Sequence, residues 1–121
     1  MKLQDKHIRI VALTCLILTF VTITIFSLMK AENVAKVGLT LNDKVMHFAA
    51  YTALGFFFYL TSRKYALTIL FGFAFSFIIE ILQEYNSRAM EALDLVANLS
   101  GLIIGILCVK IFLKIIKPLM E

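Results

Sequence analysis

The chain has 121 residues, of which 61% are hydrophobic and only 17% are charged, and its mean hydropathy is +0.92. These values lie outside the usual range of soluble domains and predict an integral membrane protein. A formal net charge of +4 would favour nucleic-acid binding in a soluble protein, but here the lysines flank apolar runs, where they orient membrane helices. We therefore expect a multi-pass protein of the cell membrane with no nucleic-acid partner.

Four apolar segments are long enough to cross the hydrocarbon core of a bilayer, which takes about 20 helical residues. The second and third are joined by the short polar run Ser62-Arg63-Lys64. The predicted fold class is therefore all-α, with four transmembrane helices in a compact bundle that forms a single domain over residues 1–121. The predicted spans cover about residues 8–29, 45–61, 65–82 and 93–113.

The basic N-terminus and the apolar run that follows it resemble a secretory signal peptide. The uncharged run Ile10–Met29 is long, however, and no small-residue cleavage site follows it, so we expect a retained transmembrane helix. At the other end of the chain, Pro118 is expected to lie in a tail beyond the fourth helix, because proline disrupts a helix interior.

Basic residues are unevenly distributed between the two ends of the predicted bundle. Under the positive-inside rule, this bias predicts that both termini are cytoplasmic. The notable polar residues of the second, third and fourth spans then all lie at the outer face. Most of the twelve basic residues fall on the predicted cytoplasmic side: Lys2, Lys6, Arg9, Arg63, Lys64, Lys110, Lys114 and Lys117.

Polar side chains at the outer ends of these spans recur at helical spacing. Residues three or four apart share one helix face, and a charged group at a helix centre costs about 2.5 to 3.5 kcal/mol on insertion scales. We therefore expect the three polar stripes to face one another and to form a polar pocket open to the exterior. The pairs that share a face are His47 with Tyr51, Glu80 with Gln83, and Asp94 with Asn98.

The same residues carry a family resemblance. Over roughly residues 41 to 106, the chain resembles the VanZ-like family. Its proteins are small bacterial membrane proteins named for resistance to the glycopeptide teicoplanin, and the resemblance implies no established biochemical activity. One departure is Asn86, where the family commonly has proline. The matching residues are the run Asp43-Lys44-Val45-Met46-His47-Phe48, then Tyr51, Gly55, Glu80, Gln83, Arg88, Asp94, Asn98, Gly101 and Gly105.

The residue types suggest roles in the pocket. His47 and Glu80 are expected to act as general acid and base, with Asp94 as the third catalytic group. Arg88 and Lys44 suit a phosphate, and the remaining substrate-binding candidates are Tyr51, Gln83 and Asn98.

Purely structural roles stay open for several of these residues. Glu80 can be a neutral acid that bonds across the bundle, and Asp94 can cap the fourth helix. Lys44 can simply extend to the membrane interface. For His47, a bond to Tyr51 or to a carboxylate that locks two helices together is the corresponding alternative.

Two functions of different class follow from the pocket. In the first, the protein acts on or binds a phosphate-bearing lipid or cell-envelope precursor, as a lipid-linked phosphate hydrolase or transferase, with a link to teicoplanin resistance. In the second, it is a non-catalytic binding or envelope-assembly protein that sequesters a lipid head group, a glycopeptide or a partner helix.

No cofactor or metal is assigned from the sequence. His47, Glu80 and Asp94 could supply three metal ligands from three helices, but no HExxH or ExxH spacing supports a metal site. Gly101 and Gly105 form a GxxxG step, which predicts close helix packing. The same step allows a homo-oligomer.

Overall fold

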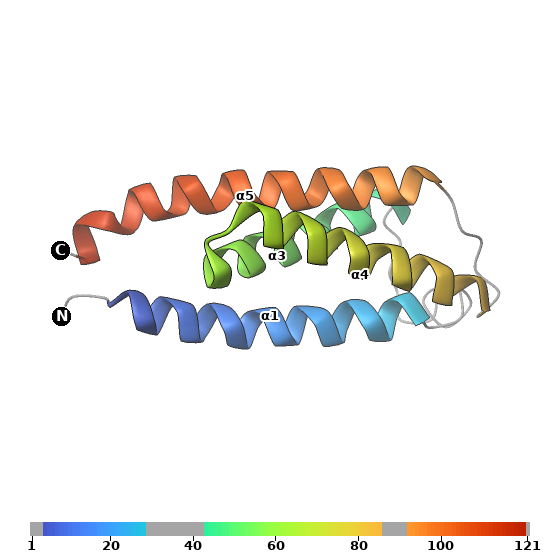
Figure 1. The fold of residues 1–121 in the computed structure, drawn as a ribbon, viewed down its shortest axis with the longest axis horizontal. Coiled ribbons are helices and arrows are strands. Elements are labelled where there is room, and N and C mark those ends of the chain that lie inside the picture. The colour runs from blue at the N-terminus through green and yellow to red at the C-terminus, as the bar shows by residue number, and fades with distance from the viewer. Residues whose placement is uncertain (1–3, 29–42, 86–91, 121) are drawn as a thin grey trace.

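The computed structural model describes residues 4–28, 43–85 and 92–120, which fall almost entirely in four helices. The described residues contain no strand. Each helix is long and apolar enough to cross a membrane, which confirms the prediction of an all-α bundle with four transmembrane helices. The helices are α1 (Asp5–Leu28), α3 (Asp43–Ser62), α4 (Tyr65–Tyr85) and α5 (Ala92–Met120) (Figure 1).

The helices alternate in direction, so that α1 and α4 run one way while α3 and α5 run the other (Figure 1). Both chain termini lie at the same end of the bundle. The first turns of α3 and α5 and the last turn of α4 therefore meet at the opposite end, as the predicted spans require. The side of the membrane on which the termini lie stays a prediction.

Helix α3 has the most extensive packing contacts of the four helices, chiefly with α5 and then with α1 and α4. Its closest approach is to α5, where glycines replace side chains at the contact. A Cβ atom on Gly101 would lie 2.6 Å from the backbone oxygen of Phe48, and one on Gly55 would lie 2.6 Å from the backbone oxygen of Leu102. The GxxxG step of α5 is thus used inside the bundle, against α3, where small residues let two backbones approach closely.

Helix α5 is longer than the sequence predicted, since it continues to Met120 and includes Pro118. The prediction that Pro118 lies in a tail beyond the helix is therefore wrong. Proline loses its own N–H donor and crowds the carbonyl four residues before it, but Pro118 lies only two residues before the last residue of the helix, Met120. At about 1.5 Å per residue, α5 measures about 43 Å, against about 30 Å for the hydrocarbon core. Its exposed lysines, Lys110, Lys114 and Lys117, all lie in its C-terminal part.

A polar contact ties α1 to the turn between α3 and α4 at the end of the bundle that holds the termini. Arg63 Nη2 donates to Asp5 Oδ1 at 2.7 Å, and Arg9 Nε donates to Asp5 Oδ2 at 2.8 Å. Arg9 Nη1 also donates to the backbone oxygen of Thr61 at 3.1 Å. Arg63 has a φ of 59°, and this left-handed turn lets α4 begin after only two intervening residues, Arg63 and Lys64.

Candidate functional site

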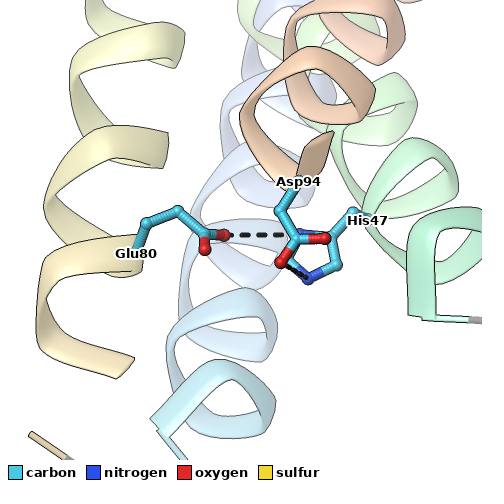
Figure 2. Close-up of side chains that lie close together, drawn as sticks. All are labelled: His47, Glu80 and Asp94. Carbon is cyan, nitrogen blue, oxygen red and sulfur yellow. Dashed lines mark ion pairs between the residues drawn. The ribbon is translucent and has the colours of Figure 1, made fainter. Parts of the chain in front are cut away.

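Three ionisable side chains from three helices converge at the end of the bundle opposite the termini. His47 comes from α3, Glu80 from α4 and Asp94 from α5, and their side chains point toward one another (Figure 2). One ring nitrogen of His47 and one oxygen of each carboxylate lie within 4.8 Å of one another. The predicted spans thus bring their polar stripes together at these three positions, and we call His47, Glu80 and Asp94 the ionisable cluster.

The ionisable cluster is buried. The exposed fractions are 9% for His47, 0% for Glu80 and 3% for Asp94, so each group has lost most of its hydration and depends on protein contacts. The expected opening of a pocket to the exterior stays a prediction, since residues 29–42 and 86–91 lie outside the described part of the chain. Arg88 is among the residues that the structure does not describe.

Asn98 fixes the orientation of the His47 ring. Its Nδ2 donates to Ser76 Oγ at 2.6 Å, which leaves Asn98 Oδ1 facing His47 Nδ1 at 3.0 Å. An amide oxygen only accepts hydrogen bonds, so Nδ1 must be the donor. In the neutral ring, the lone pair is then on Nε2. Nε2 is therefore the nitrogen that can accept a proton or bind a cation.

Asp94 connects the Nε2 side of His47 to the surface of the bundle. Its Oδ2 lies 4.0 Å from His47 Nε2, and its Oδ1 lies 2.7 Å from the ammonium of Lys44. The Lys44 side chain is 34% exposed, so the ammonium lies between the buried cluster and the surroundings. Asp94 also belongs to the first turn of α5, where the helix dipole favours a carboxylate.

Glu80 approaches the opposite side of the imidazole ring. Its Oε1 lies 3.5 Å from His47 Nδ1, so the Nδ1–H group faces both this carboxylate and the Asn98 amide oxygen. The two carboxylates of the ionisable cluster thus lie next to different nitrogens of one ring. His47 is the element that links them.

The structure also describes Gln83 and Tyr51, which the sequence predicted to bind substrate. Gln83 Nε2 donates to the backbone oxygen of Ser27 at 3.0 Å, so its amide ties α4 to the end of α1. Tyr51 is 2% exposed, and the polar side chains that its hydroxyl faces are those of Ser76 and Glu80. Its ring packs against Phe75, with centroids 6.3 Å apart.

Ser76 is a member of the polar network that the sequence prediction missed. It is fully buried and accepts the hydrogen bond from Asn98. No role in the pocket was predicted for Ser76 from the sequence. Helical spacing could have predicted its place in the network, because Ser76 lies four residues before Glu80 and the two side chains therefore share one face of α4.

The ionisable cluster includes the residues that could hold a metal ion, and no other such group of three occurs in the described ranges. Imidazole nitrogen and carboxylate oxygen are common ligands of Zn²⁺ and related cations. The arrangement can also support proton transfer, because an oriented imidazole lies next to two carboxylates.

The fold and the ionisable cluster together define a class: a small four-span helical membrane protein with ionisable groups buried between three helices near one end. A sequence model of the VanZ/LLP1 family matches residues 3–113. Because this match covers most of the chain, the protein belongs to the VanZ/LLP1 family, as the resemblance predicted. Neither the curated proteins nor the solved structures contain a match.

Proposed function

We propose that this protein acts on or binds a phosphate-bearing lipid, or a lipid-linked precursor of the cell envelope, at the outer face of the cell membrane. The reaction class is that of a lipid-linked phosphate hydrolase or transferase. The observation that carries this proposal is the oriented His47 ring, whose Nε2 faces the Asp94–Lys44 ion pair. Ionisable groups inside membrane helices are rare and mark functional sites by default.

Lys44 supports the assignment of a phosphate. Its side chain is 34% exposed while that of its partner Asp94 is buried, and in this proposal an anionic head group approaches Lys44 from outside the ion pair. Arg88 lies outside the described residues and stays the sequence-predicted second phosphate ligand, because guanidinium donors match phosphate oxygens. An acyl or prenyl tail would lie between helices, next to the exposed apolar side chains.

His47 and Glu80 supply proton transfer in this proposal. Asn98 holds the ring so that Nε2 carries the lone pair, and Nε2 can take a proton from an attacking hydroxyl or water. Glu80 and Asp94 stabilise the imidazolium that results, because each carboxylate lies next to one ring nitrogen. General acid–base catalysis of this kind contributes about 10²- to 10⁴-fold in rate.

Non-catalytic binding is the second candidate function. It is favoured by the burial of all three members of the ionisable cluster, because a closed polar network also stabilises a bundle without any chemistry. The protein would then sequester a lipid head group, a glycopeptide or a partner helix. Glu80→Gln separates the two functions, since an enzyme keeps lipid affinity and loses turnover while a binder has no turnover to lose.

The experiment uses the full chain in lipid nanodiscs that contain a polyprenyl diphosphate or phosphatidic acid. Phosphate release and head-group transfer are followed by ³¹P NMR, and binding by native mass spectrometry. Lys44→Ala is expected to weaken binding of both lipids. The matched control is Lys64→Ala, which removes an exposed lysine from the other end of the bundle. If the two substitutions had equal effects on lipid binding, the proposed role of Lys44 in binding would be contradicted.

We also propose a link to teicoplanin resistance. It rests on family membership, since the family takes its name from that phenotype. Expression in a susceptible Gram-positive host is expected to raise the inhibitory concentration of teicoplanin several-fold, and His47→Ala at equal membrane abundance is expected to abolish the increase. An unchanged phenotype with His47→Ala would separate resistance from the ionisable cluster.

A further inference from the structure

We propose that the ionisable cluster binds one divalent transition-metal cation, held by His47 Nε2, Asp94 Oδ2 and an oxygen of Glu80. The proposal deepens the proposed function and rests on it in one respect, because the cation would take a phosphate oxygen as a further ligand. The starting observation is that one ligand atom from each of these residues lies within 4.8 Å of the other two. They come from three helices, so the bundle itself sets their spacing (Figure 2).

The first two ligands lie at the upper limit of the separation that one cation allows, so they would have to approach each other to hold a tetrahedral ion. Two atoms that each lie about 2.1 Å from a metal are about 3 to 4 Å apart, depending on the coordination angle. His47 Nε2 and Asp94 Oδ2 are 4.0 Å apart. Glu80 must move furthest, since its Oε1 lies on the Nδ1 side of the ring, so the proposal requires its side chain to rotate toward Nε2.

The surroundings of the first two ligands are those of a metal site. A metal-binding histidine donates its other ring N–H to an oxygen, which fixes the tautomer and the ring orientation. Asn98 Oδ1 accepts that hydrogen bond from His47, and Ser76 in turn holds Asn98. Asp94 is supported in the same way, because Lys44 pairs with Oδ1 and leaves Oδ2 for the cation.

The donor set selects the class of cation. One imidazole with two carboxylates suits Zn²⁺ or Mn²⁺, whereas Mg²⁺ and Ca²⁺ prefer oxygen ligands alone. With the metal bound, His47 Nε2 would be a ligand and could not act as the base assigned to it above, so Glu80 would be the proton acceptor of the metal-bound protein. The remaining coordination position is the one that a phosphate oxygen or a water would take.

The test measures metal binding without any lipid substrate. The full chain is purified in detergent with its affinity tag removed, stripped with a chelator, and dialysed against Zn²⁺ or Mn²⁺. Bound metal is then counted by mass spectrometry. We expect one ion per chain for at least one of the two metals. His47→Ala and Asp94→Asn are each expected to weaken binding at least about 10-fold, and Asn98→Ala by about 10- to 100-fold, as for other partners of metal ligands.

The chain provides its own control, because it has two histidines and His7 is exposed on α1. His7→Ala should leave binding unchanged. Should His47→Ala fail to fold, Asp94→Asn keeps the side-chain shape and still tests the site. Absence of stoichiometric binding, or an equal loss in His7→Ala, would overturn the proposal.

A second arm distinguishes failure of the metal proposal from failure of the proposed function. Turnover of the phosphate-bearing lipid is measured before and after chelation, and again after Zn²⁺ or Mn²⁺ is restored. Loss on chelation and recovery with metal supports both proposals. If turnover continues after complete removal of the metal, the proposed function stands and the participation of a metal in it is contradicted. Bound metal without any turnover keeps the metal site and contradicts catalysis.

Discussion

The Nδ1 nitrogen of His47 and the Oδ1 oxygen of Asn98 lie 3.0 Å apart in the buried centre of the polar network. This contact joins α3 to α5 and, through Ser76, to α4. It also fixes the His47 tautomer, on which both the proton-transfer proposal and the metal proposal depend. One hydrogen bond thus has a structural and a functional consequence.

Asn98→Ala is expected to lower stability by about 1 to 2 kcal/mol. The substitution removes two interhelical hydrogen bonds, and single contacts of this kind in membrane proteins contribute on average about 0.6 kcal/mol, with a maximum near 1.7. The measurement is equilibrium unfolding in mixed micelles. Ser100→Ala on the same helix is the control, with an expected change within about 0.5 kcal/mol. Equal stability of the two variants would contradict the contact.

Gly101→Ala is expected to be more destabilising than Gly72→Ala. A Cβ on Gly101 would meet backbone atoms, Phe48 O at 2.6 Å and Thr52 N at 2.9 Å, whereas a Cβ on Gly72 would meet only side-chain carbons of Leu102. A side chain can rotate away, but the backbone of α3 must shift, at a cost of about 1 to 3 kcal/mol. Thermal unfolding of the two variants in the same detergent tests this order, and the reverse order would exclude the α3–α5 contact through Gly101.

Gln83→Ala is expected to loosen α1 while leaving lipid binding within about three-fold of wild type. The amide of Gln83 is engaged with the backbone oxygen of Ser27, so its loss affects the packing of α1 on α4. Hydrogen exchange at the end of α1 should become faster. A large loss of lipid affinity with unchanged exchange would instead support the substrate-binding role that the sequence predicted for Gln83.

The orientation of the bundle is tested by accessibility of introduced cysteines. Lys64→Cys lies at the end that holds the termini, and Ala92→Cys lies at the opposite end. Lys64 and Ala92 are both exposed. The positive-inside rule predicts that a membrane-impermeant thiol reagent added to intact cells labels Ala92→Cys alone. Replacing Cys15 and Cys108 by serine removes the native thiols, which are both free. Labelling of Lys64→Cys alone would invert the predicted topology and place the ionisable cluster at the cytoplasmic face.

The sequence by itself determined the four apolar spans, because a membrane demands long helices whose backbone hydrogen bonds are satisfied internally. The order of the spans also put His47 and Asn98 at neighbouring ends, since consecutive helices that each cross a membrane must alternate in direction. The family followed from the same residues.

Only the tertiary structure decided how each helix is rotated about its axis. Periodicity shows which residues share a face, but the neighbour of that face depends on how the whole bundle packs. The glycine contact between α5 and α3, the bond from Gln83 to α1 and the inclusion of Ser76 therefore required coordinates. The choice of Nδ1 as the donor of His47 depends on a single amide 51 residues away in the chain, a relationship that no local pattern contains.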